Sequence, residues 1–80
     1  MSIEVVIVYV NGKEFSITLE EINEPGVVYH WVAETNVNGI RIIDKTSNRG
    51  DGTKEDVIER IKYSIAHELY RQENGISKPK

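Results

Sequence analysis

The amino-acid sequence predicts an α+β fold in which a four-stranded antiparallel β-meander carries one C-terminal amphipathic helix, packed on one face. Three observations predict it. Apolar, β-branched segments recur through the first half of the chain, tight-turn residues separate them, and the last third changes to the 3.6-residue period of a helix. We expect residues 1–76 to form a single domain and residues 77–80 to be a frayed tail.

Four strands are expected, at residues 3–10, 13–19, 27–35 and 40–44. Asn11-Gly12 should join the first two, because both residue types tolerate the positive φ of a type I′ turn. The Glu-Pro-Gly sequence at residues 24–26 fits a type II turn. Residues 36–39 supply a second hairpin turn with Asn38-Gly39 as its centre, so strands adjacent in sequence should pair in space.

The helix is expected to begin after Thr53, which forms an acidic variant of the capping box with Asp56. Glu55 and Asp56 also suit the positive end of the helix dipole. The helix should run to about residue 73 or 74, with Gly75 as its left-handed cap.

This helix has two non-polar stripes. The stripe expected to pack on the sheet consists of Val57, Ile58, Ile61, Ile65 and Leu69. Tyr63, His67 and Tyr70 fall together on the opposite side. Either these aromatic side chains are simply tolerated at a surface, or they form a contact surface for a protein partner.

The sheet also has more apolar surface than one helix can cover. The first strand carries Ile3, Val5, Ile7 and Tyr9 on one face and Val6, Val8 and Val10 on the other. We assign to the open face a valine patch made of Val6, Val8, Val28 and Val32, joined by Ile43 and interrupted by Glu14, Ser16, Thr18, His30 and Arg41. The patch either reflects β-propensity on a partly wet surface or is covered by a second copy or another protein.

Composition narrows the function classes. Thirteen acidic and ten basic residues give a net charge of −3, which argues against bulk attraction to nucleic acid or to an anionic membrane. The chain has no cysteine and only two histidines, His30 and His67, so neither a disulfide framework nor a metal site is expected. The apolar run at residues 5–10 is too short to span a bilayer, and no signal peptide is evident, which predicts a cytoplasmic protein.

No catalytic or cofactor motif is found. The loop at residues 47–54 bears glycines and opens a helix, but it ends in Gly-Thr-Lys, whereas a phosphate-binding loop ends in Gly-Lys-Ser/Thr. Its Arg-Gly-Asp tripeptide and its scattered Asp and Asn residues match an adhesion motif and a calcium loop only superficially. No serine lies in a recognisable nucleophile sequence, so a non-enzymatic protein without cofactors is expected.

Three functional hypotheses follow. The leading one is a protein-interaction module that self-associates as a homodimer, through the helix aromatics or the valine patch. The second is a nucleic-acid-binding or regulatory protein that uses a basic patch between the fourth strand and the helix, made of Arg41, Lys45, Arg49 and Lys54. The third is a small enzyme or ligand binder with its site near His30 and Trp31.

Overall fold

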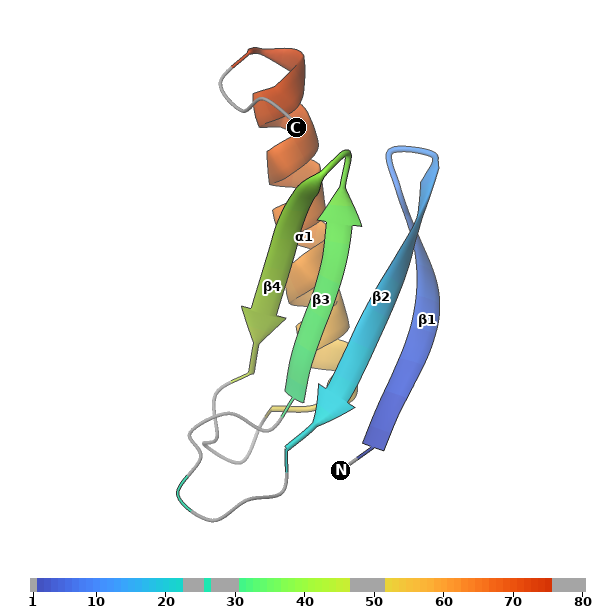
Figure 1. Cartoon of the computed structure of the whole chain (residues 1–80), viewed down its shortest axis with the longest axis vertical. Helices are drawn as coiled ribbons and strands as arrows, with labels where there is room; N and C mark the ends of the chain where they lie inside the picture. The colour runs from blue at the N-terminus through green and yellow to red at the C-terminus, as the bar shows by residue number, and fades with distance from the viewer. Residues whose placement is uncertain (1, 23–25, 27–30, 47–51, 76–80) are drawn as a thin grey trace.

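A computed structural model describes residues 2–22, 26, 31–46 and 52–75. Strands β1 (Ser2–Val10), β2 (Lys13–Glu21), β3 (Trp31–Val37) and β4 (Ile40–Lys45) form one antiparallel sheet in the order β1-β2-β3-β4. Helix α1 (Lys54–Glu73) lies across one face of this sheet, behind it in the view of Figure 1. The predicted meander with one C-terminal helix is therefore confirmed.

Both hairpin turns form at the predicted dipeptides. Asn11 and Gly12 have φ values of 53° and 76°, and Asn38 and Gly39 have φ values of 53° and 95°, as type I′ turns require. The second turn is tighter than predicted, because β3 continues two residues past Thr35 to Val37. Burial of the Thr35 and Val37 side chains accounts for this extension of the strand.

Several predictions fall partly or wholly outside the described residues. They concern strand residues 27–30, residues 47–51 of the predicted loop and the tail at 77–80. Of the predicted turn at 24–26 only Gly26 is described, and its φ of 85° fits the third position of a type II turn.

Helix α1 begins and ends where the sequence indicates. The Thr53 hydroxyl accepts a hydrogen bond from the Asp56 backbone amide (3.1 Å), and the Asp56 carboxylate accepts one from the Thr53 amide (3.2 Å). These reciprocal bonds complete the capping box. At the other end Asn74 donates its amide to the Tyr70 carbonyl, and Gly75 takes the left-handed conformation with a φ of 72°.

The core lies between α1 and the covered face of the sheet. Its buried apolar residues are Val10, Ile17, Leu19, Ala33, Val37, Val57, Ile61, Ile65 and Leu69. The predicted helix stripe is thus confirmed, with Ile58 half-buried at its border. Thr35 also lies on the covered face, where its hydroxyl donates to the Ser16 carbonyl (2.9 Å) and links β3 to β2.

Candidate interaction surface

The largest exposed apolar feature of the described residues is a row of side chains along β1. Ile3, Val5, Ile7 and Tyr9 alternate along the strand and are 47–67% exposed. We call these four residues the outer row. Contiguous exposed apolar patches are often functional, so the outer row is the candidate interaction surface.

The register between β1 and β2 explains why these residues face outward. Val6 pairs with Ile17 and Val8 with Phe15, and residues directly opposite each other in an antiparallel pair point to the same face. Because Ile17 is fully buried beneath α1, Val6 and Val8 point toward the helix as well. The intervening residues of β1 must then point to the open face.

The predicted valine patch is therefore corrected. Val6 and Val8 pack against the core on the helix-covered face, and the outer row takes the place we had assigned to them. Val32 does lie on the open face, half-buried, since it pairs with Glu20 and Lys45. Val28 lies outside the described residues. The signal for the correct assignment was present in the sequence, because a two-residue turn at Asn11-Gly12 fixes which residues of β1 oppose Phe15 and Ile17.

The two edges of the sheet differ in chemistry. Strand β4 is six residues long and carries Arg41, Asp44 and Lys45, charges of the kind that protect an edge from pairing with other chains. Strand β1 is nine residues long and has Glu4 as its only charge, with neither lysine nor proline. Its pairing with β2 runs without a bulge from Ser2 to Val10. Strand β1 is therefore the less protected of the two edges.

The predicted aromatic stripe of α1 is exposed and adjoins the outer row. Tyr63 is 77% and Tyr70 60% exposed, and His67 is exposed as well. A shallow pocket of about 270 Å³ separates α1 from the end of β1, and both Tyr9 and Tyr63 line it. Tyr63 of the aromatic stripe and Tyr9 of the outer row therefore line the same pocket.

A second hollow, of about 540 Å³, separates α1 from β4 and has both polar and apolar side chains in its lining. Arg41, Tyr63, His67 and Arg71 line it. Beside it the Ser64 hydroxyl donates to the Asp44 carboxylate (2.5 Å), which ties the helix to β4.

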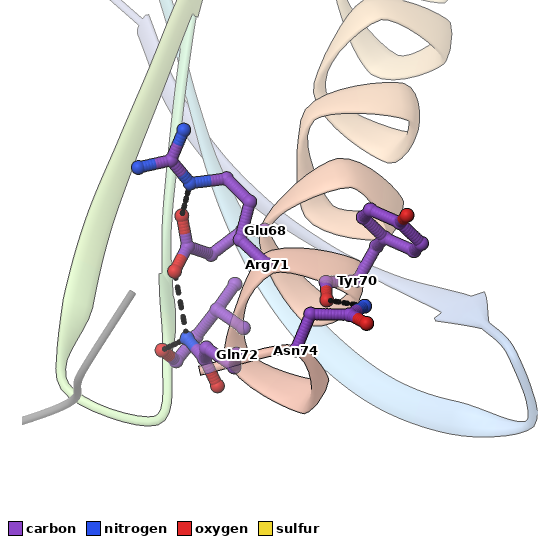
Figure 2. Close-up of polar contacts among 6 residues, drawn as sticks. Glu68, Tyr70, Arg71, Gln72 and Asn74 are labelled. Atoms are coloured by element: carbon purple, nitrogen blue, oxygen red, sulfur yellow. Dashed lines mark hydrogen bonds and ion pairs between the residues drawn. The ribbon is translucent and has the colours of Figure 1, made fainter. Parts of the chain in front are cut away.

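The side chains at the C-terminal end of α1 form a polar network that holds the helix on the β3–β4 hairpin. Figure 2 shows Gln72 at its centre, donating to the Val37 carbonyl (2.9 Å) and to the buried Glu68 carboxylate (3.0 Å). Arg71 Nε lies 3.8 Å from Glu68 Oε1 and forms an ion pair. Asn74 caps the last turn by donating to the Tyr70 carbonyl (2.7 Å). These contacts have a structural role.

The predicted basic patch is partly neutralised within the molecule. Arg41 donates to Glu34 at 2.7 Å, and Lys54 lies 3.1 Å from a Glu4 carboxylate oxygen. The hydrogen bond to Glu34, and secondly its negative charge, raise the pKa of Arg41 above its ordinary value. Lys45 also interacts within the fold, and Arg49 lies outside the described residues. Each of the three predicted cations in the described part of the chain thus takes part in an interaction within the fold.

The remaining site hypotheses gain no geometric support. Within the described ranges, no cluster of three or more His, Asp or Glu side chains is arranged to hold a metal ion. Trp31 packs half-buried against the core, and His30 lies outside those ranges. No described helix is long and apolar enough to cross a membrane.

Comparison with known proteins adds no relative. No protein-family model, curated protein or solved structure matches this chain.

Proposed function

We propose that this chain is a non-enzymatic protein-interaction module that also self-associates, and that the outer row of β1 is its contact surface. The observation that carries the proposal is the exposure of Ile3, Val5, Ile7 and Tyr9 on an edge strand whose single charged residue is Glu4. The cytoplasmic location inferred from the sequence stays a prediction.

The neighbouring helix surface supports this choice of site. Tyr63 shares a pocket with Tyr9, so a partner that covers the end of β1 would also touch an aromatic side chain of α1. Tyrosines are enriched among the residues that dominate binding energy at interfaces, since they bury a large apolar ring and keep a hydroxyl for hydrogen bonding.

Site-specific photocrosslinking in cells tests the proposal. A photoreactive amino acid replaces Val5 in the outer row or, as the matched control, Thr18, which is exposed and lies opposite Val5 on the same face. We expect covalent adducts from position 5 and few from position 18. Adducts that form at position 5 in excess of those at position 18 support the outer row as a contact surface.

A pair of charge variants sharpens this experiment. Ile7→Lys places a charge in the outer row, whereas Ser16→Lys places the same charge on the paired residue of β2, on the same face. We expect Ile7→Lys to abolish the adducts formed at position 5 and Ser16→Lys to leave them. Absence of adducts at position 5, or equal adducts at both positions, would contradict the proposal.

A further inference from the structure

The backbone of β1 presents hydrogen-bonding groups along its free edge. Val10 and Lys13 flank a two-residue turn, so they form a hydrogen-bonded pair, and alternate residues from Val10 back along the strand bond to β2. The residues between them are those of the outer row, and their N–H and C=O groups point away from β2. No described strand pairs with this edge.

We infer that these groups pair with β1 of a second copy of the chain, antiparallel, about a two-fold axis that passes beside Val6. The inference rests on the proposed function and names the partner at its contact surface. Two four-stranded sheets would thereby join into one sheet of eight strands, with both helices on the same side.

The residues of β1 are self-complementary in this register. Ile3 lies opposite Tyr9 of the second copy, and Val5 lies opposite Ile7 of the second copy. Pairs of aromatic and β-branched residues across antiparallel strands are favourable contacts. All four outward-pointing residues then find a partner. A register shifted by two residues would leave one residue of the outer row unpaired in each copy. A register shifted by one residue would place the outer row of one copy opposite residues of the helix-covered face of the other.

The charge pattern favours this edge pairing over stacking of the open faces. Glu4 would lie opposite Val8 of the second copy, well away from the other Glu4, and its charge is already paired with Lys54. The open face of the central strands carries Glu20 and Glu34, which belong to the same face as Val32 and Ile43. Stacking two such faces would desolvate these carboxylates.

The small size of the inferred interface predicts a weak dimer. Pairing of two nine-residue strands by their edges buries less than the roughly 1,200–2,000 Å² of a standard stable interface. The dimer should therefore be reversible and its population should depend on protein concentration.

Disulfide trapping in the purified 80-residue chain tests both the partner and the register. The chain has no cysteine, so each introduced thiol reports on one position. Val6 faces Val6 of the second copy as a non-hydrogen-bonded pair, whose Cα atoms lie about 4.5 Å apart, within the range of a disulfide. We expect Val6→Cys to form a covalent dimer of about twice 9.1 kDa under mild oxidation.

Val5→Cys and Ile7→Cys are the matched controls. Each lies one residue from the axis, so its two copies are offset by two residues, or roughly 6.6 Å, along the strands. We expect both to cross-link at least about tenfold more slowly than Val6→Cys. Faster trapping at position 5 or 7 would overturn the register.

Two results together would overturn self-pairing altogether. They are a Val6→Cys variant that forms no covalent dimer and an unmodified protein that stays at 9.1 kDa in light scattering at every concentration. That result leaves the proposed function standing if photocrosslinking at position 5 yields adducts of another mass. If position 5 forms no adducts at all in cells, both the proposed function and the inferred self-pairing are contradicted.

Discussion

Truncation of Ile65 tests whether α1 holds the sheet as the structure shows. Ile65 is a residue of α1 and is fully buried in the core between the helix and the sheet, so Ile65→Ala removes apolar contacts and leaves a cavity. Changes of this kind cost about 2–5 kcal/mol. A domain of this size has a free energy of unfolding of about 4–12 kcal/mol, so a large share of it would be lost. A loss of ~3 kcal/mol corresponds to a fall in Tm of about 10–25 °C.

The assay is urea unfolding of the full chain followed by far-ultraviolet circular dichroism, at low protein concentration. Ile3→Ala is the control, because it makes the same chemical change at a side chain that is 67% exposed. We expect this variant to change the free energy of unfolding by less than about 0.5 kcal/mol at that concentration. Equal losses in the two variants, or a loss below about 1 kcal/mol for Ile65→Ala, would refute the packing described here.

Two further predictions concern local structure. Thr53→Ala removes the capping hydroxyl and should lower the free energy of unfolding by about 0.5–2 kcal/mol, whereas Thr53→Ser should restore most of it; equal losses in a urea titration would rule out the cap. Gly12→Ala should cost about 1–2 kcal/mol because φ is 76° there, although no atom lies within 4 Å of the added Cβ. Gly12→Asn should cost less in thermal unfolding, and the reverse order would contradict a type I′ turn.

The parts of the fold that depend on residues close together in the sequence could be predicted from the sequence. Asn11-Gly12 and Asn38-Gly39 encode their turns through tolerance of positive φ, and Thr53 with Asp56 encodes the start of α1. The helix stripe through Ile61 and Ile65 was predictable for the same reason, because a period of 3.6 residues places the aliphatic side chains of the helix on one face.

The orientation of β1 was not obtained from periodicity, because Val5 to Val8 are apolar at every position and alternation gives no preference for either face. The register with β2 decides it. The Gln72 network and the Ser64–Asp44 bond were also missed, since each joins α1 to β3 or β4 and exists only after the layers have packed. The exposure of the outer row, and the pocket that Tyr9 shares with Tyr63, likewise depend on how the helix packs on the sheet.

Hydrogen exchange along β1 tests most directly the central claim that a second copy pairs with its free edge. The amides of Val6 and Val8 bond to β2 and should be protected at every protein concentration. The amides of Val5 and Ile7 point outward, so we expect their protection to be low in dilute protein and to rise across about a hundredfold increase in concentration. Exchange at Val5 and Ile7 that is fast and independent of concentration would contradict the claim.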